Sequence, residues 1–328
     1  MEFSTPTSLP NYQVQATYND KILLLGSCFV ENIGKKLDES KFQVCVNPFG
    51  TLYNPCSVAS SIQTLLDGKI YKPSDLFKHG GCFHSFDHHS RFSSVDEEDC
   101  LRLINRQKSI ASDYITNAKF LFVTFGSAYI YRLKENNRIV ANCHKLPDRQ
   151  FIRELLTVEG ITELWSELIQ KLRKVNPDLR ILFTVSPIRH LKDGAHGNQI
   201  SKATLILAVQ QLMERHPESA DYFPAYEIML DELRDYRFYA EDMVHPSNQA
   251  IQYIWNRFVS CFMSSDTKEI MHQWEEIQKA MNHKPFQPES EAYQKFILQT
   301  MLKIEQITKK IPSFDTQNEL EALKSKLK

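Results

Sequence analysis

KILLLGS, at residues 21–27, is the stretch that decides the fold. Its four consecutive apolar residues show no polar alternation, which is typical of a strand covered on both faces, as in a parallel sheet. The run ends in glycine and serine, and Val30, Ile33 and Leu37 then follow at helical spacing. The stretch therefore predicts a buried parallel strand that turns directly into a helix, with Ser27 at the turn.

Three further apolar runs end in turn-forming residues in the same way. They are FQVCVNPFG at 42–50, KFLFVTFGS at 119–127 and RILFTVSPI at 180–188, and a shorter run suggests a fifth strand around 225–229. Helical patterns lie between them, with starts expected at Asn54-Pro55, near Thr157 and at Ser247. Strands that alternate with helices predict an α/β fold, with a mostly parallel five-stranded sheet between two layers of helices.

The composition changes after the last of these helices, from about Ser264 onward. Lys, Glu and Gln become frequent and the apolar positions sparse, so we expect one α/β domain over residues 1–263 and a C-terminal helical extension over residues 264–328. The apolar positions of the extension form two stripes, Met301, Ile304 and Ile307, and then Leu320, Leu323 and Leu327. We expect these stripes to pack on the core, and an oligomerisation arm is the alternative.

Composition and charge exclude several classes of protein. The formal net charge of the 328 residues is -1, which disfavours binding to nucleic acid. The start of the chain has no signal-peptide pattern and no stretch approaches the roughly 18 apolar residues of a membrane span, so we expect a cytoplasmic protein without a membrane partner. Seven cysteines without a CxxC pair favour free thiols. Nothing in the sequence calls for a cofactor.

Small and reactive residues gather where the predicted strands end. Ser27 and Gly50 end the first and second runs, Gly126 and Ser127 the third, and Ser186 the fourth. Ligands of open parallel sheets bind beyond these carboxyl ends. A serine at a strand-to-helix turn exposes its hydroxyl, and its own N–H lies at a helix N-terminus, where positive partial charge can stabilise an oxyanion. Ser27 is therefore a candidate nucleophile, and a simple helix cap is the alternative.

EDMVHPSNQA, at residues 241–250, supplies the partners that such a nucleophile needs. Asp242 and His245 stand three residues apart, so both side chains can share one face of a turn. The carboxylate can then hold the imidazole in the tautomer that accepts a proton from Ser27. A turn with a capping carboxylate is the alternative for this segment alone. Together, the three residues predict a catalytic triad.

Further polar residues are candidates for contact with a substrate. They come from loops that follow the predicted strands, where specificity is commonly found. The candidates are His84, Ser85, Arg91, Gly126, Ser127, His144 and Arg189, with His190 and Lys192 beside the last of them. The histidines of residues 79–89, with Cys82, do not have the spacing of a zinc site, so no metal is predicted. Cys28, at a helix N-terminus, is an alternative nucleophile.

The segment Gly26-Ser27-Cys28-Phe29-Val30 resembles the motif Gly-Ser-Cys-Phe-Ala that names the GSCFA-domain proteins, a bacterial group related to the SGNH (GDSL-type) hydrolases. The similarity covers roughly residues 1–262. Its other segments are NPFGTLYNP at 47–55, HSFDHHSRFS at 84–93, TFGSAY at 124–129, ANCHKLP at 141–147, TVSPIRHLKDG at 184–194 and YRFYAEDMVHPS at 236–247.

This resemblance implies a three-layer flavodoxin-like fold with Ser27, Asp242 and His245 as the triad. It implies that the N–H of Gly50 joins that of Ser27 in an oxyanion hole. The superfamily's third block, Gly-x-Asn-Asp, is Gly-Ser-Ala-Tyr at 126–129 in this chain, so its asparagine donor is missing there. Asn142 is the candidate replacement. Gly26 also stands where the superfamily usually has an aspartate.

The expected function is that of a serine esterase or acyltransferase. The resemblance implies an O-acyl ester as substrate, with an acetyl group on a small molecule or carbohydrate as the favoured case. A glycan- or peptide-binding module on the same fold, with weak catalysis or none, is the alternative. A structural scaffold built on the C-terminal helices is a third reading, and it leaves the strand-end residues unexplained.

Overall fold

A computed structural model describes residues 5–327 of the chain and contains a central sheet of five parallel strands. Across the sheet they are β2 (Gln43–Val46), β1 (Lys21–Gly26), β5 (Phe120–Phe125), β9 (Arg180–Val185) and β10 (Ala220–Tyr222). In chain order this arrangement is 2-1-3-4-5, the flavodoxin-like order. The predicted α/β class and the first four strands are confirmed.

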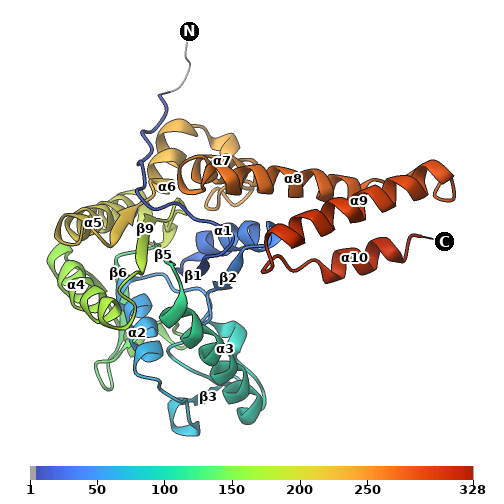
Figure 1. The fold of residues 1–328 in the computed structure, drawn as a ribbon. Helices are drawn as coiled ribbons and strands as arrows, with labels where there is room; N and C mark the ends of the chain where they lie inside the picture. The colour runs from blue at the N-terminus through green and yellow to red at the C-terminus, as the bar shows by residue number, and fades with distance from the viewer. Residues whose placement is uncertain (1–4, 328) are drawn as a thin grey trace.

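Helices cover both faces of this sheet, which gives three layers (Figure 1). One face carries α1 (Cys28–Glu39) and α7 (Asn248–Phe262), and the other carries α2 (Pro55–Leu66), α3 (Glu97–Asn117), α4 (Val158–Val175) and α5 (Gly194–Arg215). Successive strand residues point to opposite faces, so Leu24 packs with the first group and Leu23 and Leu25 with the second. Burial on both faces explains why the strands are continuously apolar.

The predicted helix starts are confirmed by capping hydrogen bonds. Asn54 Oδ1 accepts from the N–H of Ser57 at 2.8 Å, and Pro55 occupies the first turn of α2. The hydroxyl of Thr157 caps α4 in the same way at 3.1 Å. Ser247 caps α7 at 3.3 Å.

The fifth strand lies elsewhere than predicted. Residues 225–229 are helical, in α6 (Ala225–Glu227) and the π-helical turn Ile228–Glu232, and the strand is β10 at 220–222. Ala225, Ile228 and Met229 are buried at positions i, i+3 and i+4, which is helical spacing. A short apolar run fits a buried strand or a buried helix equally well, and here the helix forms.

Residues 129–155, for which the sequence predicts no element, form a small antiparallel sheet. Its strands are β6 (Tyr129–Leu133), β7 (Ile139–Val140) and β8 (Phe151–Leu155), with β6 in the middle. A hairpin of β3 (Phe77–His79) and β4 (Cys82–His84) precedes α3. Because β6 begins directly after the end of β5, the small sheet stands beside the carboxyl edge of the main sheet.

The C-terminal helices α8 (Ser265–Asn282), α9 (Glu291–Lys310) and α10 (Gln317–Lys324) extend to one side of the sheet (Figure 1). Ile304, Ile307 and Leu323 are buried in the core on the α1 side, so both predicted stripes pack. Trp274 Nε1 also donates to the carbonyl of Glu39, at the end of α1, at 2.9 Å. No helix within residues 5–327 has both the length and the apolar character required to cross a bilayer.

Candidate active site

The site begins where β1 ends against β5. Gly26 has a φ of +139°, and a side-chain carbon there would lie 2.2 Å from the carbonyl oxygen of Thr124 on β5. Only glycine fits this contact and this backbone conformation. The chain therefore leaves β1 beside β5, which is the switch point where ligands of flavodoxin-like sheets bind. Ser27 is the next residue.

Ser27 occupies the N-cap position of α1, but its side chain caps nothing. It makes no side-chain hydrogen bond to the helix, is 2% exposed, and its Oγ has no partner among the described residues. A buried hydroxyl without a hydrogen bond costs about 1–3 kcal/mol. The helix-cap alternative does not explain this hydroxyl, so Ser27 stays a candidate nucleophile.

Asp242 and His245 form a hydrogen-bonded pair. His245 Nδ1 lies 2.6 Å from Asp242 Oδ2, and Asp242 Oδ1 accepts from the backbone N–H groups of Val244 and His245 at 2.9 and 3.0 Å. These hydrogen bonds lower the pKa of Asp242 to about 2. With Nδ1–H held by an ionised carboxylate, Nε2 of His245 is left as a proton acceptor. Both side chains are about half exposed, at 50% and 47%.

A cavity of about 440 Å³ joins the segments on which these residues lie. Cys28, next to Ser27, and His245 both line it, and the backbone N–H of Arg189 holds the carbonyl of Val244 at 3.2 Å. The hydrogen-bond pattern within residues 5–327 includes no bond between Ser27 and His245. Cys28 and His245 thus line one cavity, and Asp242 is joined to His245, whereas Ser27 is not joined to His245 by a hydrogen bond.

Five other residues considered in the sequence analysis lie at this cavity, His190 and Lys192 among them. Asn142, Ser127 and Arg189 line it, together with Tyr53, Tyr129 and Tyr131. Ser127 Oγ accepts from the N–H of Tyr129 at 3.1 Å. The guanidinium of Arg189 lies 4.1 Å from the ring centre of Tyr239. Gly126 lies beside Ser27, since a side-chain carbon on Gly126 would be 3.1 Å from Ser27 Cβ.

The two backbone donors expected for the oxyanion are engaged elsewhere. The N–H of Ser27 donates to the carbonyl of Thr124 at 3.1 Å, and the N–H of Gly50 donates to the carbonyl of Asn47 at 2.7 Å. Gly50 packs against His89, whose Cβ would lie 2.2 Å from a side-chain carbon on Gly50. In this structure neither N–H is directed at a substrate, which corrects the predicted oxyanion hole.

Other donors are open at the cavity. Cys28 opens α1, where the first N–H groups have no partner within the helix and Ser27 does not cap them. Asn142 Oδ1 accepts from the N–H of His144 at 2.8 Å, and its Nδ2 has no hydrogen bond to any described residue. Cys28 N–H and Asn142 Nδ2 can therefore donate to a bound carbonyl.

His84, Ser85 and His144 lie in a packed cluster and not at the cavity, contrary to prediction. His84 is held through both ring nitrogens, by Ser93 Oγ at 2.6 Å and the carbonyl of His79 at 3.0 Å. His144 Nε2 lies 2.8 Å from the carbonyl of Ser85, and burial lowers the pKa of His144 to about 4. These side chains order the long connection instead of contacting a substrate.

Arg91 stabilises the backbone at the ends of β1 and β2, next to the site. Its guanidinium donates to the carbonyl of Asn47 and lies 3.6 Å from Glu31. Asn47 Oδ1 in turn accepts from the N–H of Gly26 at 2.9 Å. Arg91 thus helps to hold the ends of β1 and β2 together, and it does not line the cavity.

A fully buried lysine that was not predicted from the sequence lies next to the site. Lys202 on α5 is 0% exposed, and its Nζ donates to the carbonyls of Gly126 and Ser186, both at 2.7 Å. Burial lowers the pKa of Lys202 to about 7. Lysines are mostly exposed, so a lysine in an amphipathic helix gives no signal of this role. The polar stripe Asn198, Ser201 and Lys202, at positions i, i+3 and i+4, could have signalled it.

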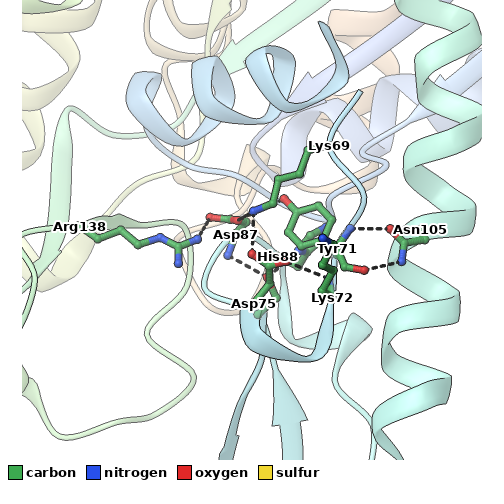
Figure 2. Close-up of polar contacts among 9 residues, drawn as sticks. Lys69, Tyr71, Lys72, Asp75, Asp87, His88, Asn105 and Arg138 are labelled. Atoms are coloured by element: carbon green, nitrogen blue, oxygen red, sulfur yellow. Dashed lines mark hydrogen bonds and ion pairs between the residues drawn. The ribbon is translucent and has the colours of Figure 1, made fainter. Parts of the chain in front are cut away.

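A second, larger cavity of about 620 Å³ lies between α2, α4 and the small sheet. Figure 2 shows the charges at its rim, where Asp87 accepts from Arg138 at 2.6 Å and from the hydroxyl of Tyr71 at 3.1 Å, with Lys69 at 3.9 Å. These groups satisfy one another, and none of the described residues that line this cavity is a histidine. We therefore place the chemistry at the smaller cavity. Residues 5–327 contain no cluster of three or more His, Cys, Asp or Glu that could hold a metal ion.

Comparison with known proteins adds the family. The sequence profile described as "GSCFA family" matches residues 21–258, and "GSCFA domain protein, C-terminal domain" matches residues 274–328. No curated protein matches the chain. Among solved structures, it is similar to an acetyl xylan esterase (Est2A) from the rumen bacterium Butyrivibrio proteoclasticus, with a TM-score of 0.38 and 10% identity. That match covers 76% of this chain and 64% of the esterase.

Proposed function

This chain belongs to the GSCFA family, and we propose that it is a serine hydrolase or acyltransferase that acts on O-acyl esters. The observation that carries the proposal is the buried, unpartnered hydroxyl of Ser27 at the start of α1. It lies beside the cavity that also holds His245, whose imidazole is oriented by Asp242. A nucleophile, a base and a residue that orients the base are the parts that acyl transfer needs.

The proposed acylation step begins when the Ser27 side chain turns toward His245. His245 Nε2 removes the hydroxyl proton as Oγ forms a bond to the ester carbonyl carbon, and the carbonyl electron pair moves onto its oxygen. The tetrahedral intermediate then expels the alcohol, which takes the proton from His245. In this proposal the oxyanion accepts hydrogen bonds from Cys28 N–H and Asn142 Nδ2, two residues that line the cavity.

The second step returns the free enzyme. Water or another hydroxyl gives its proton to His245 and attacks the acyl carbon, and Ser27 leaves with the proton restored. We favour an acetylated carbohydrate as substrate. Tyr53, Tyr129 and Tyr131 line the cavity together with Asn142, and aromatic faces beside amide groups suit a sugar ring with its hydroxyls.

Hydrolysis of activated acetyl esters tests this proposal. Ser27→Ala should reduce turnover of p-nitrophenyl acetate by about a thousandfold or more, as expected when a nucleophile is removed. Cys28→Ala is the matched control at the neighbouring position and should retain turnover within a few fold. Full turnover by the Ser27→Ala variant would contradict the assignment of the nucleophile.

A binding module is the second candidate, and the missing hydrogen bond between Ser27 and His245 favours it. Such a module would bind glycans or peptides in the same cavity and would hydrolyse no ester. Calorimetry with acetylated oligosaccharides discriminates between the two. Saturable heat without release of acetate identifies a binder, whereas release of acetate that depends on Ser27 identifies the enzyme.

A further inference from the structure

The oxyanion of the proposed reaction lacks the donors that a serine at this turn would usually supply. The N–H groups of Ser27 and Gly50 are bonded to Thr124 and Asn47. A developing negative charge in a water-poor site needs fixed donors, and the loss of one donor typically costs about 100- to 1000-fold in kcat. Any side-chain donor that lies close to Ser27 therefore matters.

His190 is such a side chain. Its Nε2 would lie 3.4 Å from a side-chain carbon on Gly126, and Ser27 Cβ would lie 3.1 Å from the same point. His190 Nε2 and Ser27 Cβ therefore lie at most 6.5 Å apart, which is the sum of the two distances. The ring lines the 440 Å³ cavity, and its Nε2 is buried and makes no hydrogen bond of normal geometry, although the backbone of Gly126 is close enough to raise the pKa of His190 against the effect of burial. A carbonyl oxygen bound next to Ser27 would lie within reach of this ring.

The surroundings of His190 fix its position. Its backbone N–H donates to Asn198 Oδ1 at 3.0 Å, which ties the turn after β9 to α5. Its ring meets the ring of Tyr53 edge-on, with the ring centres 5.9 Å apart. A preorganised donor of this kind needs no rearrangement at the moment of reaction.

The same surroundings keep the ring neutral. Burial lowers the pKa of His190 to about 4, and the positive charge of Lys202 acts in the same direction. The nearest carboxylate in sequence, Asp193, is 4% exposed and pairs with Arg153. His190 thus lacks the carboxylate that orients a general base, whereas His245 has one. A neutral imidazole carries one N–H, which it can donate without a net charge.

We propose that His190 donates a hydrogen bond to the oxyanion formed when Ser27 attacks the ester, and is thus a further catalytic residue. This inference rests on the proposed function. His190 transfers no proton in it: the Ser27 proton goes to His245 and then to the leaving alcohol. The new element is the division of labour between the two histidines, with His245 as the base and His190 as the donor.

Steady-state kinetics of three variants tests the inference, with p-nitrophenyl acetate as the probe. His190→Leu removes the donor and should lower kcat by about 100- to 1000-fold, with KM changed by less than about threefold. His190→Gln keeps an N–H near the position of Nε2 and should recover at least about tenfold of that loss. The pH dependence of kcat should be the same in the wild type and in the glutamine variant, since the base is untouched.

His216→Leu is the matched control. His216 also has a buried Nε2 without a partner, but it follows the far end of α5, roughly 33 Å from the start of that 22-residue helix. The kcat of the His216→Leu variant should equal that of the wild type. The inference is overturned if His190→Leu keeps the wild-type kcat, or if the glutamine and leucine variants lose the same amount.

Labelling of the wild type separates failure of the inference from failure of the proposed function. If an alkyl fluorophosphonate labels Ser27 and the wild type hydrolyses the ester, but His190→Leu is as fast as the wild type, only the role of His190 is wrong. If the wild type is neither labelled nor active, the proposed function falls and the role of His190 falls with it.

Discussion

At Asp242 the two carboxylate oxygens have different partners. Oδ1 accepts from two backbone N–H groups and shapes the turn, while Oδ2 faces His245 Nδ1. Because the pKa of Asp242 is lowered to about 2, this carboxylate stays ionised at neutral pH. One oxygen of Asp242 thus stabilises the turn, and the other orients the His245 ring.

Asp242→Asn should therefore keep the fold and lose most of the catalytic activity. The amide oxygen can still accept from Val244 and His245, but the amide N–H₂ faces Nδ1 and forces the tautomer whose Nε2 cannot accept a proton. We expect kcat for an activated ester to fall by about 100- to 10,000-fold, with an unchanged circular dichroism spectrum. Asp235 is an exposed aspartate that likewise accepts from a backbone N–H. Asp235→Asn should change neither kcat nor the circular dichroism spectrum. A fully active Asp242→Asn variant would refute the orienting role.

The positions of single residues could be predicted where they depend on a short stretch of sequence. Ser27 at a strand end and Asp242 three residues before His245 are patterns contained in a few positions. His84, Ser85 and His144 were predicted at the cavity and instead lie in a packed cluster away from it, in which Ser85 and His144 are buried. Whether a loop side chain faces inward or outward depends on tertiary packing, which the local sequence does not contain.

At the scale of elements, the first half of α5 anchors the carboxyl ends of the neighbouring strands. Ser201 Oγ accepts from the N–H of Ala128 at 2.8 Å, Asn198 holds His190, and Lys202 holds the carbonyls of Gly126 and Ser186. One helix face thus fixes the ends of β5 and β9 relative to Ser27. This arrangement explains why buried polar residues interrupt an otherwise apolar face.

Ser201→Ala should weaken this anchor. It leaves the buried N–H of Ala128 without an acceptor, so the free energy of unfolding should fall by about 1–3 kcal/mol. Chemical denaturation measures this change through the midpoint at constant slope. Thr204→Ala, three positions further along the same helix, removes only an exposed hydroxyl that bonds within the helix, and should change stability by less than about 0.5 kcal/mol. Equal stability of the two variants would show that Ser201 does not anchor the strand end.

Elements were predictable from the sequence when their burial was uniform. Four strands of the central sheet and four of the helices that cover it follow from apolar runs and caps, whereas α3 buries only Cys100, Ile104, Ala111 and Ile115 along 21 residues. The strands of the small sheet mix tyrosine, arginine and leucine, as in YIYRL of β6. Weak patterns of this kind carry too little signal in a single sequence.

At the scale of the whole molecule, the fold holds several histidines neutral. Burial is the main cause of the lowered pKa values of His88, His144 and His190, which are about 3, 4 and 4. Their ordinary value is 6.5. Between about pH 4 and 6.5 the unfolded chain therefore binds protons that the folded chain does not.

Stability should accordingly fall as the pH is lowered from about 6.5 to about 4, and be fully present above that window. Each histidine contributes a slope of up to about 1.4 kcal/mol per pH unit. Urea denaturation at pH 6.5, 5.5 and 4.5 measures how steeply the free energy of unfolding depends on pH. His190→Gln should reduce this slope by up to about 1.4 kcal/mol per pH unit, because one titrating group is removed. A free energy of unfolding that stays constant over this range would contradict the burial of these rings as neutral groups.

The order of the strands could be expected from the sequence only through resemblance, and the cavity could not be expected at all. Its walls come from β6, the turn after β9 and the loop before α7, which are far apart in the chain. Their convergence is a consequence of the 2-1-3-4-5 order, which places the ends of β1, β5 and β9 side by side.

The most direct test of the central claim is covalent labelling of the intact chain by an alkyl fluorophosphonate, followed by mass spectrometry of the intact protein and of its peptides. We predict a single adduct on Ser27, absent from Ser27→Ala and much slower to form in His245→Ala, because the histidine activates the serine. Labelling that is absent, that falls on another residue such as Cys28 or Ser127, or that is equally fast without His245 would contradict the account.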